Sequence, residues 1–372
     1  MSISGDNLHN LFSHCEICPR SCGAARAEGG AGYCGADLRM RIARAALHMW
    51  EEPCISGERG SGAVFFTGCN LGCVFCQNYE ISHGGASAKS DDSCRASDDF
   101  LAGISRPGRY VTSSELADIF LDLESQGAHN INCVTATHFL PAVCESIDIA
   151  RGRGLTIPAL YNCGGYESAR MIAAYGGRFD IFMPDMKYIS ENLSGMLSAA
   201  PDYPAAAKAS IDEMVRLRPE PVFDESGLMR SGVIVRHLIL PGHTREAIAV
   251  LEYLASKYGN SIYISLLGQY TPAGIFANQN QTSGDATYPG GDASSTGGDA
   301  DSCQLIHTEI GVSSRLRHLP PREISNLSRR LTQREYDKVV DAAIRLGLKN
   351  VYIQDPSGSS SAAYIPDFHQ FD

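Results

Sequence analysis

The chain has 372 residues, and its 44% hydrophobic content is enough for one large α/β domain plus a small appendage. A formal net charge of −11 disfavours the broad basic surface of a nucleic-acid-binding protein. No apolar run approaches the length of a membrane span, and the N-terminus lacks a basic region followed by an apolar stretch, so we expect a cytoplasmic protein without membrane association. In that setting thirteen cysteines favour metal binding over a disulfide framework.

The first cysteine-rich segment lies near the N-terminus. Cys15, Cys18, Cys22 and Cys34 are interspersed with glycines and Pro19, which supply the turns that let a short chain fold around an ion. The spacing lacks the two C-x2-C pairs that are usual in structural zinc sites, and it also lacks a ferredoxin run. The segment therefore predicts a metal site that holds zinc or an iron-sulfur cluster, and free or redox-active thiols are the alternative.

A lead-in from Arg39 to Glu58 starts with a strand-like pattern and ends in turns. Its polar residues either line the entrance of a site or are structural, and we favour a packed Trp50 with Glu51 and Glu52 solvated. Cys54 is either an additional metal ligand or, as is more common for a single cysteine, a small buried residue.

The second cysteine motif lies within Ala63 to Tyr79. Cys69, Cys73 and Cys76 have the spacing C-x3-C-x2-C and follow a short apolar run that favours a β-strand. Three thiolates leave one iron of a [4Fe-4S] cluster without a protein ligand, so an exogenous molecule can bind that iron. Ferredoxin runs supply a fourth cysteine, and structural zinc prefers a closed tetrahedron. The motif thus indicates a cluster with one open iron, and the alternative is a zinc loop or thiols that lie close together by chance.

Beyond this motif the chain alternates between strand and helix patterns. Two polar, low-complexity stretches, 83–109 and 274–303, are predicted to be surface insertions. Strands are predicted, in chain order, at 63–66, 130–137, 156–162, 180–184, 232–240 and 261–267. Helices are predicted at 113–126, starting at Ser113 or Ser114, and at 141–151, 167–174, 205–217 and 245–258.

Six βα units with right-handed crossovers predict a parallel sheet with the helices outside, in an α/β fold of the partial (β/α)6 barrel type. In such barrels the chemistry lies at the C-terminal ends of the strands, where the second cysteine motif falls. We divide the chain into an N-terminal cysteine-rich segment and lead-in (1–60), a core (61–272), an insertion (273–318) and a C-terminal part (319–372). The last part holds a helix at 332–346, capped by Thr332, and a short strand.

The second motif, with Phe75 before its last cysteine, resembles that of the radical S-adenosylmethionine (SAM) superfamily. The chain as a whole is similar to the radical SAM proteins related to the pyruvate formate-lyase activating enzyme. The matching stretches are CEICPRSC, HMWEEPCISG, GCNLGCVFCQNYEIS, GAHNINCVTATHF, YNCGGYES, PDMKY, RHLILPG and LGLKNVYIQ. This resemblance implies a partial (β/α)6 radical SAM barrel.

The resemblance also implies an activity. A [4Fe-4S] cluster would bind SAM through its open iron, and an electron from a donor such as flavodoxin or ferredoxin would cleave the sulfonium to a 5′-deoxyadenosyl radical that abstracts hydrogen. The expected enzyme is a radical SAM oxidoreductase, and one option is that it installs a glycyl radical on a partner protein. The alternatives are a small-molecule substrate, or a non-catalytic iron-sulfur or zinc protein.

Site residues follow from the same resemblance. Phe75 is expected near the adenine, and residues after the second strand occupy the place where many relatives carry a G-G-E segment for the SAM amino group. That segment is absent, and its place is occupied by the strand-end residues Asn132, Thr135, Thr137 and His138. Thr135, Thr137 or His138 either replaces it by hydrogen bonding or is a strand-end cap or buried polar residue. Gln269, after the sixth strand, either contacts the nucleoside or the substrate or is structural.

Asp185 and Lys187 resemble the D-x-K element of glycyl-radical activating enzymes, for which we expect a catalytic role. Because side chains two positions apart point the same way on a strand, a carboxylate and an ammonium group can share one site. The alternative is an ordinary ion pair at the end of the strand.

Overall fold

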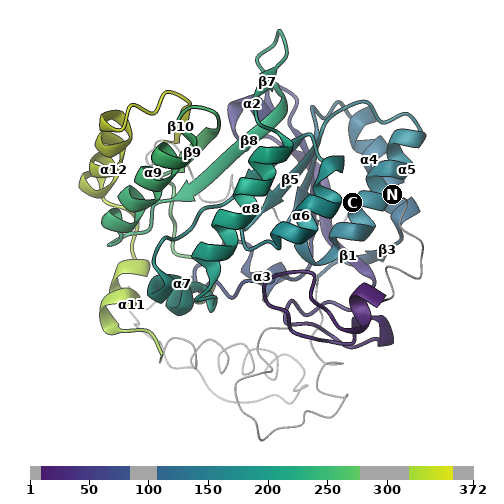
Figure 1. Cartoon of the computed structure of the whole chain (residues 1–372), viewed down its shortest axis with the longest axis horizontal. Coiled ribbons are helices and arrows are strands. Elements are labelled where there is room, and N and C mark those ends of the chain that lie inside the picture. Colours follow the sequence, from purple (N-terminus) through teal and green to yellow (C-terminus); the bar gives the residue numbers. More distant parts are fainter. Residues whose placement is uncertain (1–9, 84–106, 277–317, 355–372) are drawn as a thin grey trace, which may run out of the picture.

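The structure is a computed structural model that describes residues 10–83, 107–276 and 318–354 (Figure 1). Most of the two predicted insertions and the residues after 354 lie outside these described ranges. The described residues form a mixed α/β fold around one large, mostly parallel sheet, as the strand and helix patterns predict.

The sheet has ten strands, and seven of them run parallel in the order β10-β9-β8-β6-β5-β4-β2. Their bounds are Ser61–Phe66 (β2), Ile131–Val134 (β4), Ala159–Cys163 (β5), Ile181–Pro184 (β6), Met229–Leu238 (β8), Tyr263–Leu267 (β9) and Val351–Gln354 (β10). The antiparallel strands β1 (Met40–His48) and β3 (Arg109–Val111) extend the β2 edge, and β7 (Val222–Phe223) pairs with β8. The final strand therefore adds a seventh parallel member to the six that were predicted.

Each parallel strand is added beside its predecessor, always in the same direction along the sheet. Right-handed crossovers of this kind place the connecting helices on one face, where Figure 1 shows them. These helices are α4 (Ser113–Ser125), α5 (Leu140–Gly152), α6 (Ala169–Tyr175), α8 (Tyr203–Leu217), α9 (Thr244–Tyr258) and α12 (Gln333–Arg345). The strand order suits a barrel, but among the described residues the hydrogen-bonded path is open, from β10 to β3.

Short helices lie at the two ends of the sheet. α2 (Pro53–Ser56) is at the end where the parallel strands begin, and α3 (Tyr79–Ser82) is at the opposite end, beside the N-terminal segment (Figure 1). The others are α7 (Glu191–Ser198) and α11 (Pro321–Leu327), together with the 3-10 turns η1 (Arg26–Glu28), η4 (Thr137–Phe139), η5 (Gly176–Arg178) and η6 (Gly274–Phe276).

The two faces of the sheet bury different side chains because strand residues alternate in direction. Tyr161 and Phe182 pack in the main core beneath the helices. On the other face, Leu160 and Ile181 form a smaller apolar cluster with Cys54 of α2. Cys54 therefore lies at the end of the sheet remote from the cysteine loop, where burial raises the pKa of its thiol to about 11, in agreement with a small buried residue.

The start of α4 differs from the expected one. Thr112, and not Ser113 or Ser114, caps the helix, because Thr112 and Glu115 have the i, i+3 spacing at which each side chain accepts a hydrogen bond from the other residue's backbone N–H. Thr332 caps α12 in the same way with Glu335, as predicted. No helix in the described ranges combines the length and the apolar character that crossing a bilayer requires.

Glu335 connects α12 to the rest of the fold. Its carboxylate accepts hydrogen bonds from Arg329 (2.7 Å), from the Gly242 N–H (2.7 Å) and from Thr332, and these contacts hold its pKa well below the usual 4.5. The hydrogen bond from Arg329 is the largest cause of this lowered pKa. A depressed pKa means that the contacts stabilise the fold fully above about pH 4.5, and that this contribution is lost as the pH falls.

We therefore expect Glu335→Gln to lower the free energy of unfolding at pH 7 by about 1 to 3 kcal/mol. Urea denaturation at pH 7 and at pH 4 should show a smaller difference between variant and parent at the lower pH. Glu115→Gln is a matched control, because Glu115 makes the same capping contact with Thr112 but is exposed, and Arg109 is the smallest cause of its lowered pKa. A pH-independent difference for Glu335→Gln would contradict this account.

Candidate metal and active site

The cysteine loop begins where β2 ends, at the C-terminal edge of the parallel strands. Gly68 has a positive φ of 96°, and a side chain there would collide with the carbonyl oxygen of Cys34 from the N-terminal segment. Only glycine combines this backbone conformation with so close an approach. The N-terminal segment therefore packs directly on the loop that carries Cys69, Cys73 and Cys76.

Each thiol of this loop has a polar neighbour. The Leu71 N–H donates to Cys69 Sγ (3.4 Å), and Cys73 Sγ lies 2.9 Å from Ser198 Oγ. Cys76 Sγ lies 3.3 Å from Ser82 Oγ. Burial raises the pKa of all three thiols, that of Cys76 to about 11.

The three cysteine sulfurs of this loop are suitable ligands for a metal that prefers thiolates. The charges of Cys73 and Cys76 raise the pKa of Cys69, so the three sulfurs lie within electrostatic reach of one another. The Lys187 ammonium group acts in the opposite direction on the pKa of each of the three thiols. A metal cation that favours thiolates would overcome the effect of burial. Within the described ranges, however, no three His, Cys, Asp or Glu side chains already form a metal-ion cage.

Asp185 lies between two cations beside this loop. Its Oδ2 accepts from Lys187 Nζ (2.5 Å) and its Oδ1 accepts from Arg236 Nε (3.1 Å). Burial alone would raise the pKa of Asp185, but Lys187 and Arg236 together bring it below its usual value. Burial would likewise lower the pKa of Lys187, and Asp185 and Cys73 more than offset that effect. All three groups are therefore charged at neutral pH.

Arg236 extends this network towards Glu51. Its Nη1 lies 3.3 Å from Glu51 Oε2 and its Nη2 donates to Asn162 Oδ1 (2.5 Å). The amide groups of Asn132 and Asn162 donate to Glu51 Oε1, at 2.9 and 3.3 Å. The result is a largely buried polar network on the face of the sheet opposite the six connecting helices.

The expectation of solvated glutamates and a packed Trp50 was wrong. Trp50 is 51% exposed and Glu52 is 1% exposed, and only 10% of the Glu51 side chain is exposed. The segment after β1 enters at the N-terminal ends of the strands and turns its carboxyl groups towards Arg236. Sequence patterns could not reveal this, because the partner is 185 positions away.

The structure places the predicted site residues in several different surroundings. Asn132, Asp185 and Lys187 belong to the buried network, and Phe75 is buried beside Tyr270, with ring centroids 6.5 Å apart. Thr135 has a positive φ of 60° at the end of β4, and Gln269 follows β9 with a buried Oε1 that has no hydrogen-bond partner among the residues that the structure describes.

Thr137 and His138 form hydrogen bonds outside the Asp185–Lys187–Arg236 network. Thr137 donates to Glu167 Oε1 (2.7 Å), and Tyr161 donates to Glu167 Oε2 (2.8 Å). His138 Nε2 lies 2.9 Å from the Thr67 carbonyl at the start of the cysteine loop. Glu167 was not among the predicted site residues, yet its burial raises its pKa to about 7.

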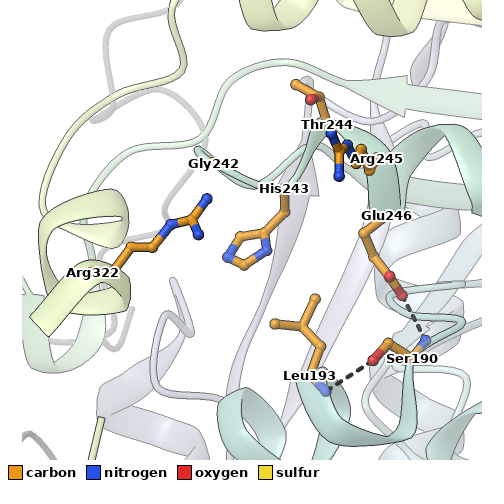
Figure 2. Close-up of a pocket in the computed structure, with 8 residues that line it drawn as sticks. All are labelled: Ser190, Leu193, Gly242, His243, Thr244, Arg245, Glu246 and Arg322. Carbon is orange, nitrogen blue, oxygen red and sulfur yellow. Dashed lines mark hydrogen bonds between the residues drawn. The ribbon is translucent and has the colours of Figure 1, made fainter. Parts of the chain in front are cut away.

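Two clefts between the described residues are lined by residues outside the cysteine loop. One, of about 490 Å³, lies between α7, the loop before α9, and α11 (Figure 2). In it His243 and Arg322 extend towards the same space, and Glu246 accepts a hydrogen bond from the Ser190 N–H. The other, of about 430 Å³, lies between Cys18 and Glu167.

Comparison with known proteins gives distant similarities. No family model matches the chain. The uncharacterized protein MJ0674 of Methanocaldococcus jannaschii is 23% identical over 265 residues, which cover 71% of this chain and 68% of that protein. The X-ray structure of the FeFe-hydrogenase maturase HydG from Carboxydothermus hydrogenoformans aligns with a TM-score of 0.37 and 11% identity, covering 79% of this chain and 58% of that one. This chain thus spans less than two thirds of HydG, and these similarities leave function to be argued from the site.

The buried network yields a stability prediction. Truncating Arg236 to Met leaves Asp185 with one cation and Glu51 with none, so we expect a loss of about 3 to 5 kcal/mol in the free energy of unfolding, measured by urea denaturation. Arg216→Met is the control, because the exposed Arg216 pairs with Glu213 on the surface of α8. Equal effects of the two substitutions would show that the network contributes no more than a surface ion pair.

Proposed function

We propose that the protein is a radical SAM enzyme whose [4Fe-4S] cluster is held by Cys69, Cys73 and Cys76. The observation that supports this most directly is the position of the three thiols, on one loop at the C-terminal edge of the parallel strands and beside the Asp185–Lys187–Arg236 network. When bound, the cluster would supply the electron that cleaves SAM reductively to a 5′-deoxyadenosyl radical for hydrogen abstraction.

The residues of the chain would bind and orient SAM. SAM carries a carboxylate and an amino group, and the network offers the complementary groups: cations on Lys187 and Arg236, and oxygen acceptors on Asp185 and Asn132. Because these groups are largely buried, their interactions with a charged ligand are stronger than in water. The apolar Phe75 would contact the adenine.

For the finer assignment we propose activation of a glycyl-radical protein, with a flavodoxin or ferredoxin as electron donor and a cytoplasmic location. Its support is the resemblance of the cysteine motif and of Asp185-x-Lys187 to the activating enzymes. A small-molecule substrate is the alternative. Electron paramagnetic resonance separates them, because a stable glycyl radical on a co-incubated partner protein is expected only from an activating enzyme.

The central test is SAM cleavage. Anaerobically reconstituted protein mixed with dithionite and SAM should release 5′-deoxyadenosine and methionine, measured by chromatography. Replacing Cys73 with Ala should abolish both the broad brown absorbance of the cluster and the release of 5′-deoxyadenosine. Cys144→Ala is the matched control, because Cys144 is buried in the core beneath the helices. Intact SAM in the presence of a reduced cluster would overturn the proposal and favour a non-catalytic iron-sulfur protein.

A second test concerns SAM binding. Lys187→Met should weaken SAM binding to the unreduced, cluster-loaded protein about 10- to 100-fold, the cost of a lost charge-assisted hydrogen bond. Equilibrium dialysis measures this without turnover. Lys208→Met serves as the control, since Lys208 lies over the Tyr253 ring on the outer helices. Unchanged affinity in Lys187→Met would remove Lys187 from the SAM site.

A further inference from the structure

Arg26 is a fully buried arginine without an acidic partner. Its guanidinium donates to the backbone carbonyls of Asp37 (2.8 and 3.2 Å) and His138 (2.8 Å), and Nη1 lies 3.6 Å from Cys15 Sγ. The Asp37 carboxylate is directed to Arg39 instead. No carboxylate in the described ranges forms an ion pair with Arg26, although a buried charge normally requires a counter-charge.

The N-terminal thiols could carry that counter-charge. A Cβ placed on Gly32 would lie 3.5 Å from Arg26 Cδ, 3.4 Å from Cys34 Sγ and 3.5 Å from Cys22 Sγ, so these atoms surround one small space. Cys15 Sγ approaches the guanidinium directly, and Cys18 lies within electrostatic range of Cys15 and Cys34. The fold therefore brings Cys15, Cys22 and Cys34 close to Arg26, with Cys18 next to two of them.

The backbone around these sulfurs supplies hydrogen-bond donors. Three of the four sulfurs accept a hydrogen bond from the N–H group two residues further along the chain: Arg20 to Cys18, Ala24 to Cys22 and Ala36 to Cys34. N–H donors of this kind suit a negatively charged sulfur, such as one bound to a metal.

We propose that Cys15, Cys18, Cys22 and Cys34 bind one metal centre as a tetrathiolate and that Arg26 is its buried counter-cation. Binding of a divalent zinc ion, or of a [4Fe-4S] cluster in its 2+ state, to four thiolates gives a net charge of −2 and releases the four thiol protons to solvent. Arg26 reduces that charge to −1. The donor set fits, because four sulfurs suit either occupant and leave no open coordination position.

This centre would also support the cysteine loop of the proposed active site. Arg20 Nε donates to the Asn70 carbonyl (2.8 Å), and the Cys34 carbonyl packs against Gly68. Arg26 holds the His138 carbonyl, and the His138 ring reaches Thr67. The proposal depends only on the N-terminal thiols and Arg26, and it stands or falls separately from SAM cleavage.

The first experiment measures metal content in the full chain with Cys69, Cys73 and Cys76 all replaced by Ala. One equivalent of zinc, or four irons with four sulfides, should remain after purification, and the analysis distinguishes the two. Adding Cys15→Ser or Cys18→Ser should remove it, whereas adding Cys144→Ser should not. A triple variant without bound metal after reconstitution with zinc or with iron and sulfide would overturn the proposal.

The second experiment tests Arg26 in the same background by competition with a chelator. Arg26→Gln, which is neutral but retains a hydrogen-bond donor, should bind the metal about 10- to 100-fold more weakly, the usual effect of losing a group that supports metal ligands. Arg26→Lys should recover most of that loss, because it restores the charge. Arg20→Gln is the matched control, as Arg20 stacks on the Tyr33 ring and bonds to carbonyls of the neighbouring loops.

Far-UV circular dichroism establishes that each variant is folded. Equal metal affinity for Arg26→Gln and the parent would reject the counter-cation role. If Arg26→Gln does not fold, Arg26→Lys decides: near-parental affinity supports the role of charge, and loss comparable to Cys15→Ser contradicts it. In either case the outcome is independent of SAM cleavage, which the Cys69/Cys73/Cys76 triple variant cannot perform.

Discussion

The contacts of the Arg236 guanidinium are the interactions on which the face of the sheet opposite the connecting helices depends. It contacts Asp185, Glu51 and Asn162, which come from three separate parts of the chain. Such a network is costly to bury unless nearly every donor and acceptor is satisfied. The strand order makes this network possible, because it puts the connecting helices on one face and leaves the other face of β5 and β8 open to the segment that follows β1.

Both cysteine clusters share an electrostatic design. Lys187 lies beside the loop of Cys69, Cys73 and Cys76, and Arg26 lies within the N-terminal cluster. In each case a buried cation accompanies thiols whose pKa is raised by burial. Placing positive charge beside sulfur lowers the energy of thiolates in a low-dielectric interior, where unpaired negative charge would be unfavourable.

Local patterns in the sequence were sufficient for the strands and for most helices. The apolar runs correctly predict the parallel strands, and Thr332 correctly predicts the start of α12. The Cys69, Cys73 and Cys76 motif could be located because its residues are adjacent in the chain. The roles of Glu51 and Arg236 could not be predicted, since an ion pair between residues so far apart in the chain leaves no periodic signal in either segment. The α4 cap was misplaced by one residue, because several hydroxyl residues stand together there and only the spacing to Glu115 selects Thr112.

The contacts of Arg20 have a consequence for the order of folding. This arginine belongs to a segment near the N-terminus, but it donates to the carbonyl of Ala199, 179 residues later in the chain. The four cysteines beside it can approach one another through short-range contacts as soon as they leave the ribosome, whereas their docking surface exists only after α7 has been synthesised. The N-terminal cysteine segment would therefore fold early but pack against the rest of the protein late. The loop with Cys69, Cys73 and Cys76 would then be covered by this segment only when most of the sheet has formed.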